Sequence, residues 1–119
     1  MKIVSIERNP QEAVGGALFP AGAVARQSLI AGQDSAQLSF TLLSFAAGAA
    51  NAFHIHTHDQ VIVVMSGTAI VATEHEQREV TAGDVVLFPA GENHWHAASS
   101  RDPVVFISVT PKGTTTEVT

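Results

Sequence analysis

The sequence predicts an all-β fold, either a sandwich or a barrel, and two observations support this class. Short runs of apolar and β-branched residues recur along the 119-residue chain, and clusters of Gly, Asp and Pro separate them. No segment keeps a helical period with capping residues, although residues 10–14 could form one short helical turn. Regularly spaced short strands in a chain of this length are typical of one domain, which we expect to span residues 1–119.

The expected strands follow one another along the chain, each rich in Val, Ile, Phe or Thr. Turns are expected at Ser66–Gly67 and over 82–84, where glycine accepts a positive φ without steric cost. The last residues, KGTTTEVT (112–119), form a polar tail that we expect to be only partly ordered. The expected strands cover residues 23–30, 36–45, 60–67, 68–75, 84–90 and 103–110, with a further strand in HWHAA.

The composition disfavours several classes of function. The chain contains no cysteine, which excludes a thiolate nucleophile, a cysteine zinc site and a disulfide, and which fits a reducing compartment. The segment MKIVSIERNP lacks the apolar run of a signal peptide, and no stretch is apolar over the length of a membrane span. A net charge of −5 would repel a phosphate backbone on average. We therefore expect a cytoplasmic protein that acts on a small molecule and binds neither nucleic acid nor a membrane.

The stretch HIHTHDQ (54–60) carries the strongest chemical signal. Alternate side chains of a strand share a face, so His54, His56 and Gln60 can point into one interior. His94, in a strand that follows a Pro-x-Gly turn, supplies a further imidazole. A single histidine on a strand is more often a core or surface residue than a ligand, and an HxH pair alone leaves both interpretations open. The second cluster favours a site for Zn²⁺, Mn²⁺, Fe²⁺, Ni²⁺ or Co²⁺.

Two spaced motifs resemble those of the cupin family. Residues 48–67 read glycine, five residues, HxH, three residues, glutamine, six residues and glycine, which matches the first cupin motif with Gln in place of Glu. Residues 83–98 read glycine, five residues, PxG, two residues and histidine, which matches the second motif up to Ala98, where the family usually has Asn. The resemblance implies a double-stranded β-helix, a jelly-roll barrel of two antiparallel sheets. It also implies one divalent metal with the ligands His54, His56, Gln60 and His94.

The glutamine changes the charge of the expected site. Three imidazoles and an amide cancel none of the charge of a divalent ion, which makes the ion a stronger Lewis acid and a better host for an anionic oxygen. The common non-haem iron oxygenase pattern contains a carboxylate, and Asp59 cannot easily supply one because its parity points it away from the ligands. Oxygenase chemistry stays open, since all-neutral iron sites occur in cupins. Among the candidate ions we favour Mn or Fe.

Three further histidines need separate interpretations. His96 shares the parity of His94 and should face the same cavity, which makes it the candidate catalytic acid or base. The alternative is a histidine that orients a ligand or a water. His58 lies in the turn between two strands of the first motif, where a surface position is favoured over a place in the site. We expect His75, in the polar hairpin TEHEQRE, to be exposed to solvent.

The stretch GENHWHAA resembles a bacterial subgroup of cupins. This subgroup includes the cupin domains found with carboxymuconolactone decarboxylase-like proteins and the manganese-dependent hydroxynitrile lyases of cupin type. Those lyases make or break a carbon–carbon bond beside a carbonyl, with the metal binding the oxygen. They carry a further histidine on the last strand, where this chain has Phe106, and this departure argues against that specific activity. Trp95 has the opposite parity to the ligands and is expected to pack on the outside of the barrel.

Two further patterns concern substrate binding and assembly. Arg26 and Arg101 are the only candidates for binding a substrate carboxylate, although a solvated surface position is favoured for both. In the strand containing SFTLLSF, both faces are apolar enough to be covered, which in cupins commonly means dimerisation. We therefore expect a homodimer. The candidate interface residues are Leu38, Phe40, Leu42 and Trp95.

Three functions are compatible with these patterns. The favoured one is a small metalloenzyme whose neutral His/His/Gln/His site acts as a Lewis acid on a small oxygen-bearing substrate, with an anion as one candidate, in lyase or isomerase chemistry. The second is a metal-dependent dioxygenase. The third is a non-catalytic ligand-binding or sensor cupin, which is weakened because a sensor needs a further domain to signal to. The fold alone does not name a substrate.

Overall fold

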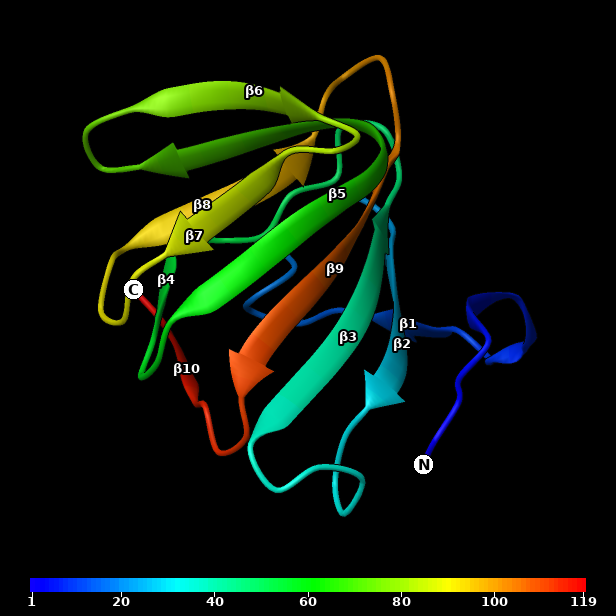
Figure 1. Ribbon diagram of the computed structural model, residues 1–119. Helices are drawn as coiled ribbons and strands as arrows, with labels where there is room; N and C mark the ends of the chain where they lie inside the picture. The colour runs from blue at the N-terminus through cyan, green and yellow to red at the C-terminus, as the bar shows by residue number, and fades with distance from the viewer.

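The computed structural model describes residues 1–119 and shows antiparallel strands that curl into a barrel (Figure 1). It confirms the predicted all-β, double-stranded β-helix. No helix is long and apolar enough to cross a membrane. The elements in chain order are a 3-10 helix η1 (Ile6–Arg8) and the strands β1 (Glu12–Val14), β2 (Val24–Ile30), β3 (Leu38–Phe45), β4 (His54–His56), β5 (Gln60–Thr73), β6 (Gln77–Thr81), β7 (Val85–Phe88), β8 (His94–Ala98), β9 (Val104–Pro111) and β10 (Thr116–Val118).

The barrel has two layers that share one long strand. The first layer has the strand order β1-β2-β3-β9-β5-β7, and the second has the order β6-β5-β8-β4-β10. The N-terminal half of β5 pairs with β7 and β9, whereas its C-terminal half pairs with β6 and β8. Figure 1 shows β5 curving from one layer to the other. The inner faces of both layers therefore meet around a common interior.

A β-bulge in β5, and not the predicted turn at Ser66–Gly67, carries the chain between the layers. The register with β9 shifts between Val64 and Ser66, which moves the buried positions from even to odd residue numbers. Gly67 has a φ of 79°, and a Cβ at this position would clash with the carbonyl oxygen of Pro103. Because glycine allows this close approach, the two strands predicted over 60–67 and 68–75 form one continuous strand.

The interior is apolar at one end and polar at the other. Phe45 of β3 and Phe106 of β9 lie almost fully buried with their ring centroids 5.4 Å apart, and Ile62 of β5 packs in the same cluster. Further along the inward face of β9, the side chains become polar at Ser108 and Thr110. The polar end of the barrel is where the histidines lie.

Two segments near the termini differ from the expectation. Residues 12–14 form the edge strand β1 rather than a helical turn, because they pair with β2; the helical turn lies earlier, at η1. The polar tail is more ordered than expected, since Thr116–Val118 pair with β4 as β10. This pairing places Thr116 opposite His56, beside the candidate site.

The outer face of the first layer is apolar across four neighbouring strands. The register aligns outward-facing side chains of β7, β5, β9 and β3 in continuous rows. At the open edge of this face, Val85 and Leu87 are 65% and 56% exposed, while Leu42 at the other end is already buried. The two rows are Leu87, Val61, Val109 and Phe40, and Val85, Val63, Ile107 and Leu42.

We propose that a second copy of this chain covers the outer face of the first layer. A monomer rarely leaves an apolar surface of this extent in water, and a two-fold contact would cover the same face of both copies. Leu38 is 46% exposed beside this face and Phe40 is half-buried on it, whereas Leu42 is already buried within the single chain. Trp95 lies elsewhere, on the outer face of the second layer, where it packs edge-on against Phe53.

We predict that the protein has at least a dimeric mass in light scattering, against a chain mass of 12.5 kDa. The double substitution Val85→Glu and Leu87→Glu should shift the mass to that of a monomer, because charges would have to be buried in the contact. His75→Glu, at an exposed turn position, is the matched control and should leave the mass unchanged. A wild-type protein that is monomeric at all concentrations would refute the proposed contact.

Candidate metal centre

Three buried histidines converge at the polar end of the barrel. His54 and His56 come from β4, and His94 comes from β8. The Cα atom of His94 lies directly opposite that of His54 in the antiparallel register. One ring nitrogen of each lies within 4.8 Å of those of the other two. His54 and His94 are each 1% exposed and His56 is 9% exposed. The strand parity predicted from the sequence therefore does bring these three imidazoles together.

Gln60 completes the group from the first position of β5. Its side-chain oxygen Oε1 lies 3.0 Å from Nε2 of His56 and 3.1 Å from Nε2 of His94. Its Nε2 donates a hydrogen bond of 2.8 Å to Oγ of Ser108 on β9. With its NH₂ group hydrogen-bonded to Ser108, the amide directs its oxygen at the histidines.

The hydrogen bonds on the far side of the rings determine which nitrogen carries the proton. Nδ1 of His54 donates to the carbonyl oxygen of Ala52 at 2.6 Å, and Nδ1 of His94 donates to the carbonyl oxygen of Glu92 at 2.8 Å. A carbonyl can only accept, so in the neutral rings the Nε2 atoms carry free lone pairs. Nδ1 of His56 lies 2.8 Å from the hydroxyl of Thr116, which suits either direction of donation. Metal-binding histidines are commonly oriented in this way.

Burial keeps these rings neutral. It lowers the pKa of His94 from 6.5 to about 4, an effect that the hydrogen bond to Glu92 only partly offsets. Burial also lowers the pKa of His54, and the pKa of His56 is lowered by burial and by the nearby His54. At neutral pH the lone pair of His94 Nε2 therefore faces the lone pairs of Gln60 Oε1 at 3.1 Å with no proton between them. A cation placed between these acceptors would resolve the contact, so the residues fit a bound metal.

An aromatic ring supports the site from the apolar side. Phe88 of β7 stacks on the imidazole of His94 with a centroid distance of 3.9 Å and an interplanar angle of 13°. Phe88 is 3% exposed, and its neighbour across the strand pair is Gln60. One apolar residue thus fixes the plane of His94 and packs beside the strand that supplies Gln60.

His96 lies behind the cluster and outside it. Its ring centroid is 5.7 Å from that of His54 and 5.1 Å from that of Phe106, and the residue is 2% exposed. Burial, followed by the neighbouring histidines, lowers the pKa of His96 well below 6.5, so the ring is neutral. The structure thus places His96 in the cavity wall, as its parity predicts, without joining the group of three.

Asn51 holds His96 and is missing from the sequence-based site. Its Nδ2 lies 3.2 Å from each ring nitrogen of His96, and its Oδ1 accepts a 2.8 Å hydrogen bond from the backbone N–H of His96. Asn51 is buried, at 6% exposed. The signal was a lone polar residue within the apolar run AANAF before HIH, which is unusual for a buried segment.

The histidines open into a cavity of about 190 Å³. Its outer wall contains hydroxyl side chains from β3, β9 and the tail, together with Arg26. Arg26 is exposed, as the favoured surface interpretation expects, and it also lies at the mouth of the cavity, on the row of β2 that pairs with Leu43. The lining residues are Leu18, Phe19, Arg26, Thr41, Leu43, Asn51, His54, His56, Gln60, His96, Ser108, Thr110, Thr114 and Thr116.

The remaining predicted polar residues lie outside the site. His58 is exposed in the turn after β4, and Asp59 is exposed with its Oδ1 accepting a hydrogen bond from the backbone N–H of Ala90. His75 and Arg101 are exposed turn residues. These positions agree with the interpretations favoured from the sequence.

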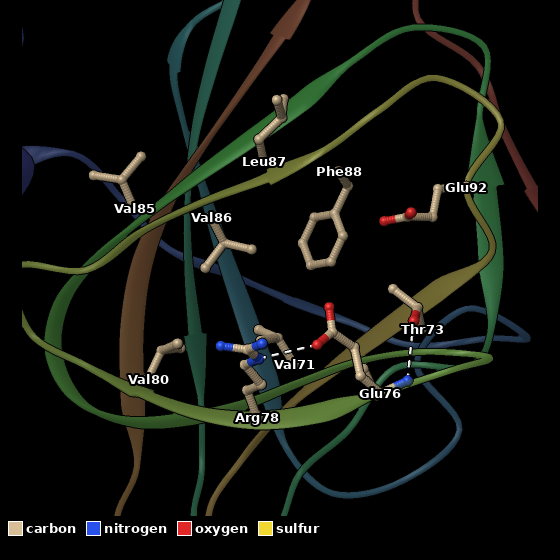
Figure 2. Close-up of a pocket in the computed structure, with 11 residues that line it drawn as sticks. Val71, Thr73, Glu76, Arg78, Val80, Val85, Val86, Leu87, Phe88 and Glu92 are labelled. Carbon is tan, nitrogen blue, oxygen red and sulfur yellow. Dashed lines mark hydrogen bonds and ion pairs between the residues drawn. The ribbon is translucent and has the colours of Figure 1, made fainter.

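A second hollow of about 300 Å³ lies between β6 and β7 (Figure 2). The rings and methyl groups of Val71, Val86 and Phe88 form its floor, and Glu76 pairs with Arg78 at its rim. Phe88 separates it from the histidines, since this ring lines the hollow and stacks on His94. The hollow contains no histidine and does not offer a comparable set of metal ligands.

The lowered histidine pKa values predict how the stability of chelator-treated protein depends on pH. The unfolded chain binds protons below pH 6.5, whereas folded His94 binds them only near pH 4. Stability should therefore fall as the pH drops from 6.5 toward 4, by roughly 5–10 °C in melting temperature between pH 7 and pH 5. His94→Gln should show a shallower decline, with His75→Gln as the control. Parallel profiles for wild type and His94→Gln would contradict this origin of the effect.

Comparison with known proteins agrees with this architecture. A family model for the cupin domain matches residues 41–110. The (R)-mandelonitrile lyase of Granulicella tundricola is 30% identical over 89 residues, which cover 74% of this chain and 68% of the lyase.

Solved structures of low sequence identity share the fold. A cupin-like protein from Thermotoga maritima has a TM-score of 0.86 at 22% identity, covering 98% of this chain and 89% of its own. The polyketide cyclase RemF from Streptomyces resistomycificus has a TM-score of 0.82 at 22% identity, covering 93% and 79%. KdgF from Halomonas sp. has a TM-score of 0.77 at 22% identity, covering 94% of each chain. Since the domain match extends over more than half of the chain, and the barrel carries its histidines within that match, the protein belongs to the cupin family.

Proposed function

We propose that the protein is a metalloenzyme that binds one divalent transition metal through His54, His56, Gln60 and His94, with Mn or Fe favoured. The observation that carries this proposal is the contact between Gln60 Oε1 and His94 Nε2, two acceptors 3.1 Å apart in a buried site. Supporting it, the fixed Nδ1–H groups of His54 and His94 direct both Nε2 lone pairs inward. The four donors are neutral, so the bound ion would keep its full charge.

The chemistry proposed for this site is Lewis-acid catalysis of the lyase or isomerase type. A bound ion of undiminished charge would polarise a hydroxyl or carbonyl oxygen of a small substrate. The protein supplies a cavity of about 190 Å³, smaller than the pockets typical of drug-sized ligands, and a neutral His96 in its wall. In the proposed reaction His96 would take a proton from the substrate hydroxyl and return one to the leaving group. Asn51 would keep its ring in place during both steps.

The similarity to the (R)-mandelonitrile lyase supports carbon–carbon bond cleavage as the reaction class. In the reverse direction such a reaction would add a carbon nucleophile to a carbonyl carbon. Phe106 stands against His96 with a ring separation of 5.1 Å, so the proposed base has an apolar neighbour. We therefore propose only the reaction class on the basis of this relative. (R)-mandelonitrile, the compound in the relative's name, is the first substrate to test.

Metal analysis tests the ligand set directly. Wild-type protein should contain close to one divalent ion per chain, and His56→Ala or His94→Ala should remove it, because each deletes one of the donors. Gln60→Glu should keep the ion but lower its Lewis acidity, because a negative charge enters the ligand set. His75→Ala is the matched histidine control and should retain the ion, since His75 is exposed. Wild-type protein without metal after growth and reconstitution with Mn²⁺ and Fe²⁺ would refute the proposed function.

A turnover assay distinguishes the reaction classes. Metal-loaded protein should cleave a carbon–carbon bond in a small hydroxy compound, with (R)-mandelonitrile as the first compound screened and hydroxy acids next, and His96→Ala should lower turnover roughly 10²–10⁴-fold while metal content stays unchanged. His58→Ala, outside the site, should leave both unchanged. Oxygen uptake without such cleavage would favour the dioxygenase alternative, and tight ligand binding without turnover would favour a binding protein. Loss of metal in His96→Ala would show that His96 is a ligand instead.

A further inference from the structure

We infer that Arg26 forms a carboxylate subsite in the cavity of the proposed metal centre, so that the substrate is a short hydroxy- or oxo-acid. Its carboxylate would pair with the guanidinium of Arg26, and its hydroxyl or carbonyl oxygen would lie at the metal. This inference rests on the proposed function and narrows it to a substrate class.

The strand register places Arg26 on the inner face of the first layer. Its Cα position pairs with Leu43 of β3 on one side and with Glu12 of β1 on the other. Leu43 is part of the buried core, so residues in this row point into the barrel. Arg26 accordingly lines the same cavity as His54 and Gln60. Since the two layers of a sandwich lie about 10 Å apart, a molecule of a few carbon atoms would span the space between the guanidinium and the histidines.

The charge distribution in the cavity favours an anion. Arg26 is the only permanently charged residue among those that line it, and the lining contains neither Asp nor Glu. A bound divalent ion would add two further positive charges, since its proposed ligands are neutral. Hydroxyl groups of Thr41, Ser108 and Thr110 line the wall near Arg26 and can donate hydrogen bonds to carboxylate oxygens. Glu12, which does not line the cavity, is the carboxylate that pairs with Arg26, so a substrate anion would bind beside Glu12 or compete with it.

Glu12 shows how Arg26 binds a carboxylate in the absence of a substrate. Nε and Nη2 of Arg26 donate to Oε1 of Glu12 at 3.3 and 2.8 Å. The side chains of Arg26 and Glu12 are 45% and 65% exposed, and an ion pair at such a position contributes little to stability. Two of the five N–H groups of the guanidinium are used, so a substrate carboxylate can bind beside Glu12 or replace it. Replacement would be favoured for an acid whose other end is already held at the metal.

Calorimetric titration of Mn²⁺-loaded protein with matched acids and esters tests the subsite. The probes are glycolate, lactate, 3-hydroxybutyrate and mandelate, each paired with its methyl ester, which removes the charge and keeps the hydroxyl. Wild-type protein should bind at least one acid ten times more tightly than its ester. Arg26→Gln should abolish this preference with unchanged metal content, and Arg26→Lys should restore part of it.

Glu12→Gln separates substrate recognition from folding. This variant breaks the same ion pair but keeps the guanidinium, so it should bind the acid several-fold more tightly than wild type. If Arg26→Gln acted only by loosening β1, then Glu12→Gln would weaken acid binding as well, and that result would overturn the inference. Equal affinity of every acid and its ester in wild-type protein would also overturn it.

Chelator-treated protein distinguishes a failure of the proposed metal site from a failure of the carboxylate subsite. The same titrations in chelator-treated protein, followed by the NMR signal of the Arg26 Nε–H group, should show weaker acid binding that still depends on Arg26. A protein that never holds metal would refute the proposed function while leaving this Arg26-dependent shift measurable. Absence of the shift in both metal-loaded and chelator-treated protein would overturn the carboxylate subsite itself.

Discussion

The neutrality of three buried imidazoles is the constraint on which the site depends. Inside the barrel a protonated histidine is unfavourable, and burial, together with the neighbouring His54 and His56, lowers the pKa of His94 to about 4. The carbonyl oxygens of Ala52 and Glu92 accept hydrogen bonds from the Nδ1–H groups of His54 and His94. These two effects leave lone pairs directed at one point, beside the oxygen of Gln60. The preference for a cation therefore comes from the backbone around the rings as much as from the rings themselves.

A single long strand creates the interior in which this can happen. β5 begins with Gln60 in the first layer and ends at Thr73 opposite His94 in the second. The bulge after Val64 reverses which side chains point inward, so both halves of the strand present buried residues to the same core. Gly67 allows the close passage beside Pro103 that this change of layer requires. The ligand geometry is thus coupled to one backbone irregularity distant from it in the sequence.

Strand parity predicted the part of the site that lies within two short segments. The alternation in HIH and HWH was sufficient to place His54, His56, His94 and His96 on inward faces, because the period of a strand is fixed at two residues, whereas Gln60 begins the next strand and its place relied on the match to the cupin motif. Parity within one strand says nothing of its neighbours, and so the sequence named Arg26 as a candidate without placing it at the cavity and did not point to Thr116. Both positions depend on pairing between strands, β2 with β3 and β10 with β4. The bulge was missed because Ser66–Gly67 is equally typical of a turn.

The change from apolar to polar side chains along the barrel interior also limits the chemistry that the cavity can support. Phe45, Phe88 and Phe106 pack around His96 at the inner end, so this ring is shielded from water and stays neutral. The open end of the cavity is formed by hydroxyl groups and Arg26. A substrate would accordingly enter with a polar or charged group outward and its reacting carbon toward His96. The proposed metal ligands lie between these two ends. A metal bound there would contact an oxygen on the substrate carbon that lies between the outward polar group and His96.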